Sequence, residues 1–157
     1  MAGTKYQVRT YGANLVAAHL RSLARRADNL RPAWPAVTRR AAAAYERSFD
    51  RQGPGWAPLA PSTVRRRVRE GYGGHGPILQ RTGSYKDSVT NPNDLHVVES
   101  DDGMVIHATH ELFPHHQFGT RKGRRVMPAR PVQVSQGDAY WMAVEIDHAL
   151  MEGYWGG

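Results

Sequence analysis

Apolar and small side chains recur in steps of three and four residues through the first third of the chain, and this stripe constrains the fold more than any other feature. Its members are Val16, Leu20, Leu23, Ala27, Leu30, Trp34, Val37, Ala41 and Ala44. Such spacing lies along one face of an α-helix. Because the face is rich in alanine and thin in bulky side chains, it predicts packing on a protein core rather than on a membrane.

Two prolines, Pro32 and Pro35, interrupt the stripe. A proline inside a helix costs about 3 kcal/mol, whereas one in the first turn is tolerated. We therefore expect two helices, over residues 13–30 and 33–50, with the prolines at the junction or in the first turn of the second helix. Since the stripe keeps its phase across the break, the pair is expected to form one kinked rod.

The middle of the chain alternates between loops rich in glycine and proline and short helical segments. A loop is expected over residues 51–60. A very basic helix then starts at Pro61-Ser62-Thr63, where the serine or the threonine would serve as the N-cap. Residues 78–89 predict one or two helical turns broken by Gly83.

Strand signals are confined to the second half of the chain and to its start. Alternating segments on either side of Asp101-Asp102-Gly103 predict a β-hairpin. A third strand is expected over residues 132–134, and residues 1–12 predict an edge strand or an arm. A C-terminal helix is expected to start at Gly137 or Asp138. That helix carries Trp141, Val144, Ile146 and Leu150.

Together these elements predict one α+β domain of 157 residues. A small antiparallel sheet packs with the N-terminal helix pair and the C-terminal helix, and long Gly/Pro-rich loops connect them. The expected parts are an edge strand or arm (1–12), a helical rod (13–50), a loop with short helices (51–92), the sheet, a loop arm and the C-terminal helix (93–152), and a tail (153–157).

The chain is basic, with 21 Lys and Arg against 14 Asp and Glu, a net charge of +7. This excess favours an anionic partner, either nucleic acid or an acidic protein surface, although it is equally typical of proteins from GC-rich genomes. The chain has no cysteine, which excludes disulfides, thiol catalysis and cysteine-based zinc sites. No apolar run reaches the roughly 18 residues that a membrane span needs, so we expect no membrane partner.

Four histidines, His107, His110, His115 and His116, lie close together in the sequence. Histidine is a common zinc ligand, so a metal site is one reading of this cluster. However, residues three apart on a strand point to opposite faces, and Pro114 argues against a regular helix here. We therefore expect surface or interface histidines and no bound metal.

Catalytic motifs are absent from the sequence. The serines lie in expected caps and turns, where local hydrogen bonding accounts for them. Two carboxylate pairs, Asp101-Asp102 and Glu145 with Asp147, are placed so that their side chains diverge. A nuclease would need clustered acidic ligands for magnesium. We expect neither enzymatic activity nor a cofactor.

Two basic clusters could contact phosphates. The first comprises Arg65, Arg66, Arg67 and Arg69, and the second comprises Arg121, Lys122, Arg124 and Arg125. Trp56, Tyr72 and Phe118 lie near them in the sequence as candidates for stacking on bases. No helix-turn-helix, OB or RRM pattern organises these residues, so solvated faces or protein contacts are favoured over non-specific DNA contact.

Four segments occur in a fixed order before the final helix. They are FDRQGPGWAPLAPSTVRRR (49–67), ILQRTGSYKDSV (78–89), HHQFGT (115–120) and MPARPV (127–132). This order resembles the phage virion morphogenesis proteins, the neck or tail-completion group of tailed bacteriophages. That family carries the patterns W.pL...T, iL..tG.L..S and HqfG...PaRpF in the same order. The resemblance covers residues 49–150.

Some positions depart from the family pattern. Tyr85 stands where the family has an aliphatic residue, and Val132 stands where it has phenylalanine. The residues that match the pattern are expected to serve packing or subunit contacts. They are Trp56, Leu59, Thr63, Leu79, Thr82, Gly83, His116, Gln117, Phe118, Gly119, Pro128, Arg130 and Pro131.

The resemblance implies a non-enzymatic virion subunit that joins heads to tails, as a homo-oligomeric, hexamer-like ring in the head-tail connector. Its implied partners are neighbouring connector, terminator or tail-tube proteins, with non-specific contact to packaged DNA. Its implied location is the virion neck, and the host cytoplasm during assembly. A tail terminator subunit is the alternative within this class, and a DNA-binding accessory protein is the alternative from another class.

Loops 51–67 and 115–131 are the expected arms that reach neighbouring subunits. In the second loop, HHQFG and MPARP are expected to be two fixed ends, with the basic run RKGRR as the exposed tip. Ring closure needs heterologous contacts, in which an arm of one subunit meets a different surface of the next.

Overall fold

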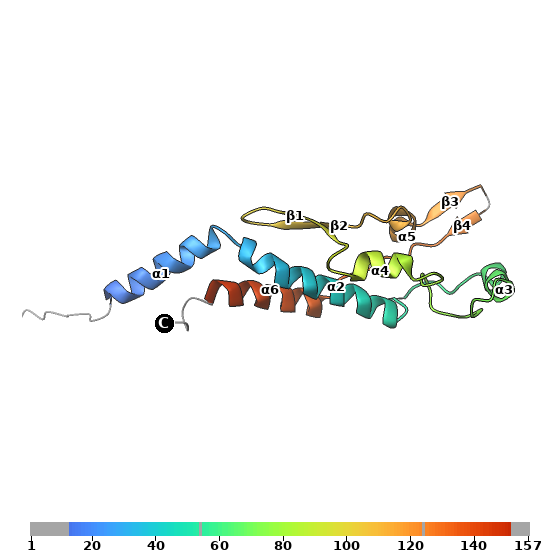
Figure 1. Cartoon of the computed structure of the whole chain (residues 1–157), viewed down its shortest axis with the longest axis horizontal. Helices are drawn as coiled ribbons and strands as arrows, with labels where there is room; N and C mark the ends of the chain where they lie inside the picture. Colours follow the sequence, from blue (N-terminus) through green and yellow to red (C-terminus); the bar gives the residue numbers. More distant parts are fainter. Residues whose placement is uncertain (1–12, 54, 124, 152–157) are drawn as a thin grey trace, which may run out of the picture.

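The computed structural model describes residues 13–53, 55–123 and 125–151, which form an α+β fold, as the sequence predicts (Figure 1). Their strands make two small antiparallel sheets in place of the single sheet that we expect from the sequence. The elements in chain order are α1 (Ala13–Ala27), the 3-10 turn η1 (Arg31–Ala33), α2 (Trp34–Asp50), α3 (Pro61–Arg69), α4 (Ser84–Thr90), β1 (His96–Glu99), β2 (Met104–His107), α5 (Phe113–Phe118), β3 (Thr120–Lys122), β4 (Arg125–Met127) and α6 (Gln136–Met151).

The two N-terminal helices meet at the prolines, as expected. Pro32 lies in the first turn of η1 and Pro35 in the first turn of α2, where neither removes a helical hydrogen bond. Figure 1 shows that α1 leaves the junction at an angle to α2 and projects past the end of α6. The prediction of a helix pair with a kink is therefore confirmed. The stripe is buried along α2, but Val16 and Leu20 on α1 are exposed.

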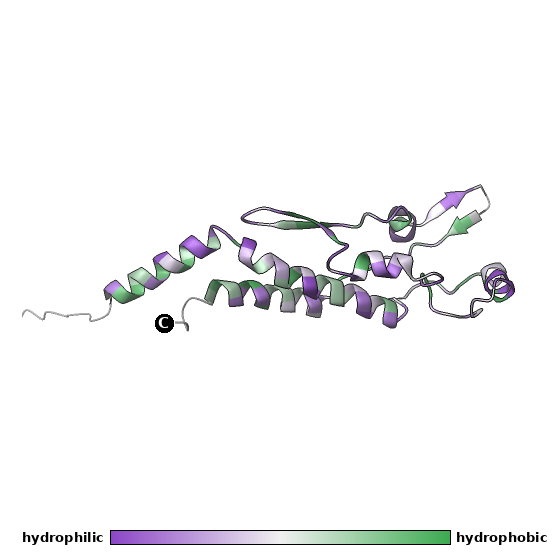
Figure 2. Ribbon diagram, in the orientation of Figure 1, coloured by the Kyte–Doolittle hydropathy of each residue, from purple (hydrophilic) through white to green (hydrophobic). Residues whose placement is uncertain are grey.

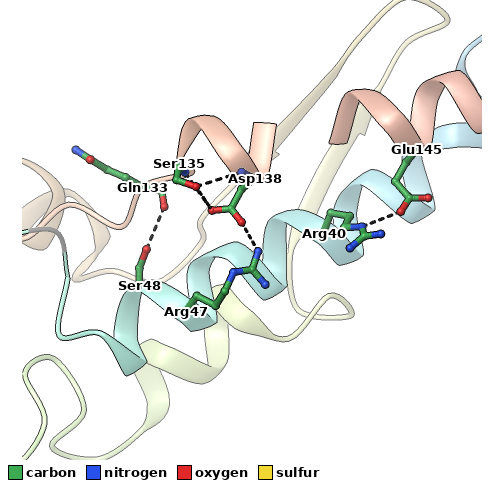
Figure 3. Close-up of polar contacts among 7 residues, drawn as sticks. All are labelled: Arg40, Arg47, Ser48, Gln133, Ser135, Asp138 and Glu145. Carbon is green, nitrogen blue, oxygen red and sulfur yellow. Dashed lines mark hydrogen bonds and ion pairs between the residues drawn. The ribbon is translucent and has the colours of Figure 1, made fainter. Parts of the chain in front are cut away.

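The C-terminal helix α6 lies along α2, and polar contacts join the two (Figure 3). Arg40 donates to Glu145 Oε1 at 2.7 Å, and Arg47 donates to Asp138. Residue Ser135 caps α6, because its Oγ accepts a hydrogen bond from the Asp138 N–H at 3.1 Å while its own N–H donates to Asp138 Oδ2 at 3.2 Å. The predicted C-terminal helix is confirmed.

The strands form two separate hairpins. In the first, β1 pairs antiparallel with β2, as predicted, and Val97 lies opposite Ile106. Its tip meets the start of α2, since Trp34 Nε1 donates to Ser100 O at 2.8 Å. In the second hairpin β3 pairs with β4, with Thr120 opposite Met127. Residues 120–127 show no alternation of apolar and polar side chains, and we did not predict this second hairpin.

Two buried clusters make up the core. Phe49, Trp56, Tyr85, Val89 and Val132 form the first, in which Phe49 meets Trp56 and Tyr85 edge to face at centroid distances of 5.6 and 5.9 Å. The second is formed by Ala33, Trp34 and Val37, and Met104, Met142, Ile146 and Ala149 pack against it from β2 and α6.

Three local predictions are wrong. The first turn of α3 has Ala60 as its N-cap, and within the described chain neither Ser62 nor Thr63 caps it, since Pro61 already fills the first turn. Residues 132–134 form no strand among those described. Instead the Val132 N–H donates to Gln117 Oε1, and the Gln133 carbonyl accepts from Ser48 Oγ at 3.0 Å.

The third wrong prediction concerns Pro114. It does not exclude a helix, because it lies in the first turn of the short helix α5, where a proline is favourable. The expected edge strand over residues 1–12 and the tail over 153–157 lie outside the described residues.

Candidate assembly surface

The loop after α2 and the segment after β4 dock on each other. Trp56 is buried and its Nε1 donates to Pro131 O at 2.9 Å. In return Arg130, of which 6% is exposed, donates from Nε to Ala57 O at 3.0 Å and from Nη2 to Pro58 O at 3.1 Å. Two segments separated by more than 70 residues thus contact each other, and we call the pair the docked unit.

In the docked unit the indole of Trp56 lies so close to the backbone of residue 53 that only glycine fits there. Gly53 has φ +73°, and a Cβ there would lie 2.0 Å from Cδ2 of Trp56. The indole therefore covers the backbone of the loop, and Trp56 is not available for stacking on bases as we had expected. Figure 1 places this part of the molecule at the end of α2 that lies opposite to α1.

The segments HHQFG and MPARP hold the β3–β4 hairpin at its base. The Arg130 N–H donates to His116 O at 2.7 Å, and the Val132 N–H donates to Gln117 Oε1 at 3.3 Å. Gly119 has φ +71°, and a Cβ there would lie 2.7 Å from Met127 O. These contacts confirm the expected fixed ends of the loop.

The hairpin itself extends into solvent. Phe118 at its base is 78% exposed, Arg121 and Lys122 are exposed on β3, and Val126 is exposed on β4. Arg124 and the side chain of Arg125 lie outside the described residues. For the described part, the basic run is at the exposed end of the hairpin, as predicted.

The basic cluster on α3 is partly used inside the molecule. Arg67 is 5% exposed, and its Nη1 donates to Gly76 O and Pro77 O, both at 3.1 Å. Burial, and then the charges of Arg81 and Arg66, lower the pKa of Arg67. The expectation that Arg67 belongs to an exposed phosphate-binding surface is therefore wrong.

The neighbouring arginines of α3 differ in their contacts. Arg66 lies 3.9 Å from Glu70 Oε1, and Glu70 also accepts from Arg81 at 3.0 Å. Arg65 and Arg69 are exposed. Only the outer part of the cluster is therefore available to an anionic partner.

Among the four clustered histidines, His107 and His115 are exposed, whereas His116 serves packing. His116 packs on Tyr85 with ring centroids 4.7 Å apart, and burial, followed by the charges of Arg130, His110 and His115, lowers the pKa of His116 to about 4. Burial raises the pKa of Tyr85 to about 12. Within the described chain, no group of three or more His, Asp or Glu side chains could hold a metal ion. The imidazole of His116 is thus neutral at neutral pH.

A groove of about 590 Å³ gathers most of the residues that match the family pattern. It lies between α3 on one side and α5 with β4 on the other, and Arg66, Arg67 and Arg81 also line it. The matching residues along it are Leu59, Thr63, Leu79, Thr82, His116, Pro128 and Arg130. The groove is open and carries both apolar and cationic side chains, a mixture suited to a protein contact.

One feature of this region escaped the sequence reasoning, namely the ion pair of Arg81 with Glu70 at the rim of the groove. Tyr85 fills the core beneath the groove. Gly83 was singled out by its match to the pattern, and the structure gives it a further role. It precedes α4 with φ +86°, a backbone conformation that side chains other than glycine rarely adopt.

Comparison with known proteins returns no matching family model, no matching curated protein and no matching solved structure. Among the helices described, none is long and apolar enough to cross a membrane.

Proposed function

We propose that this chain is a structural subunit of a tailed-bacteriophage virion, part of the neck or tail-completion ring that joins heads to tails. The observation that supports the proposal is the docking of the matching segments on one another. Trp56 contacts Pro131, and Arg130 contacts Ala57 and Pro58, although these residues lie far apart in the sequence. If residues matched the family pattern by chance alone, they would not be expected to contact one another in one place.

The docked unit supports one arm rather than two. Residues 51–60 serve as a base, because Trp56 is buried there and the backbone carbonyls of the loop accept from Arg130. The β3–β4 hairpin is the arm, because its ends are fixed by His116 and Gln117 while Phe118 and Arg121 are exposed. Exposed aromatic and arginine side chains are typical of protein interfaces.

The test replaces the charges of the arm in a phage that carries this gene. Arg121→Glu with Lys122→Glu should leave the chain folded, because both side chains are exposed, and should yield full heads and complete tails that fail to join. Negative-stain images count joined particles. A matched control, Arg65→Glu with Arg69→Glu, makes the same charge change at exposed positions on α3. Normal infectious particles from the arm variant, or equal failure of the control, would contradict the role of the arm.

A second candidate function, non-specific DNA contact, has one observation in its favour. Arg121 and Lys122 are exposed side by side on β3, where they could neutralise phosphates. Binding of duplex DNA by the isolated protein should then weaken steeply with salt, and the Arg121→Glu with Lys122→Glu variant should flatten the slope. A flat salt response of the unsubstituted protein would remove this candidate.

A further inference from the structure

One face of α1 has no cover from the part of the chain that the structure describes. Val16 and Leu20 belong to the apolar stripe, yet each is 59% exposed. The helix carries three arginines and no acidic residue. Its contact with the body lies at its C-terminal end, where Arg26 donates to Leu150 O at 2.6 Å. The rest of α1 projects past the end of α6, with apolar residues along it (Figures 1 and 2).

The last helix, α6, is apolar on two opposite sides. Met142, Ile146 and Ala149 pack on α2, together with the ion-paired Asp138 and Glu145. Residues two positions away along a helix point about 200° away, so a second row faces outward. We call this row the outer face of α6; it comprises Tyr140, Ala143, Val144, Asp147 and Met151.

The outer face carries large apolar groups that face solvent. Tyr140 is 64% exposed, and Met151 on the same face is 38% exposed. None of the residues described for α6 is buried. A helix that is apolar on all sides is normally covered on all sides, and α2 covers only one.

The exposed charges on α1 and on the outer face of α6 have opposite signs. Arg21 and Arg25 are exposed on α1, and Asp147 is exposed in the middle of the outer face of α6. No ion pair involves these three residues within the described part of the chain. The remaining acidic residues of α6, Asp138 and Glu145, are already paired with α2.

We propose that α1 of one copy of this chain packs on the outer face of α6 of the next copy. Val16 and Leu20 would cover the apolar residues around Tyr140 and Val144, and Arg21, which follows Leu20 at the flank of that face, would pair with Asp147. The helices match in length, since α1 has 15 residues and α6 has 16. The inference goes beyond the proposed function, because it holds for any assembly of this chain.

The proposed contact is heterologous. The surface given by one copy, α1, differs from the surface used on the next copy, α6. Such contacts repeat in one direction and close into a ring when the rotation between copies allows it. Within the described residues, α1 contacts its own α6 at the C-terminal end of α6, where Arg26 donates to Leu150 O. The outer face around Tyr140 therefore stays free for the neighbour.

The absence of cysteine from the chain makes the contact directly testable. Leu20→Cys and Ala143→Cys are made on two separate chains of different size, which are expressed together and oxidised. Both positions lie near the middle of their helices, so they meet whether the helices run parallel or antiparallel. A disulfide requires Cα atoms within about 7 Å. The expected result is a mixed dimer linked between positions 20 and 143.

The matched control pairs Leu20→Cys with Val105→Cys, an equally exposed apolar position on β2. Two outcomes of this cross-linking would overturn the proposal. One is a yield of mixed dimers no higher than in the control, and the other is a dominant link between two copies of Leu20→Cys. Neither of these outcomes depends on phage assembly, so failure here is separable from failure of the proposed function.

Oligomer mass provides a second measurement, made without cysteines. Leu20→Glu should raise the dissociation constant of the assembly by about ten- to a hundredfold, with unchanged far-UV circular dichroism, whereas Leu20→Met should leave it nearly unchanged. Light scattering over a concentration series measures the constant. A chain that remains monomeric without any substitution, or an assembly indifferent to Leu20→Glu, would overturn the contact.

Discussion

Helices α1 and α2 carry two halves of the same apolar stripe, yet the half on α2 is buried and the half on α1 is largely exposed. Trp34 on α2 is 3% exposed, whereas Leu20 on α1 is 59% exposed. The spacing that predicts a helix face is identical on both sides of the prolines. The difference shows that hydrophobic periodicity reports a face that needs cover, and says nothing about whether the cover comes from the same chain.

The consequence for α1 is energetic. An isolated helix of about 15 residues is marginal in water, and most helical stability comes from packing of the apolar face. In α2 that packing is supplied by α6 and by the β1–β2 hairpin. Stability measured on the dilute monomer should therefore depend on the stripe in α2 and hardly at all on the stripe in α1.

The largest expected effect tests this contrast directly. Trp34→Ala should lower the free energy of unfolding by about 3 to 5 kcal/mol, because it leaves a cavity and removes the hydrogen bond to Ser100 O. Leu20→Ala should change it by less than about 0.5 kcal/mol. Urea denaturation at low protein concentration measures both. Equal losses would mean that α1 is already covered within one chain.

The next prediction compares a buried arginine with an exposed one. Arg130 is buried and donates to two carbonyls, while Arg121 is exposed on β3. Arg130→Gln should cost about 1.5 to 3 kcal/mol, because hydrogen bonds from a charged donor are lost and the Ala57 and Pro58 carbonyls lose their partner. Arg121→Gln should stay within about 0.5 kcal/mol. Similar values for the two would show that the docked unit contributes little to stability.

The sequence predicted those parts of the fold whose signals are local. The helix pair, the β1–β2 hairpin and α6 follow from periodicity or from a turn signal within one segment. The β3–β4 hairpin was missed because Thr120–Met127 has no alternation. Residues 132–134 were misread as a strand because their β-branched side chains suggest one, whereas their polar backbone groups bond to side chains of Gln117 and Ser48.

The candidate site was predicted in its residues but not in its geometry. The contact between Trp56 and Pro131 spans 75 positions, and neither propensity nor periodicity reports such a distance along the chain. A helical consideration could have identified Arg67. Residues three positions apart on a helix share a face, so Arg67 lies on the same face of α3 as Val64, and an apolar residue indicates the face that packs on the body.

A smaller effect compares two serines at helix starts. Ser135 caps α6 through its Oγ, whereas Ser62 in the first turn of α3 makes no cap bond among those described. Ser135→Ala should cost about 1 to 2 kcal/mol, since the Asp138 N–H loses its acceptor. Ser62→Ala should be nearly neutral. Thermal or urea unfolding measures the pair, and a larger loss from Ser62→Ala would contradict the assignment of the caps.

The smallest effect compares two adjacent histidines and depends on pH. His116 is half-buried with its pKa lowered to about 4, and His115 is exposed. The unfolded chain takes up a proton near the ordinary histidine pKa of about 6.5, while the folded chain resists protonation at His116 until about pH 4. Between these pH values the unfolded state binds more protons than the folded state. The contribution of His116 to the free energy of unfolding is therefore fully present above about pH 6.5 and is lost as the pH falls.

At pH 5 the shifted pKa of His116 should therefore lower the free energy of unfolding by about 1 kcal/mol relative to pH 7.5. This is less than the full linkage value, because the side chain is partly in contact with solvent. His116→Gln should remove that part of the pH dependence, and His115→Gln should leave it in place. Urea midpoints at the two pH values measure the slope for each variant. If His116→Gln keeps the slope of the unsubstituted chain, the imidazole at position 116 is protonated in the fold, and its packing against Tyr85 does not exclude the charge.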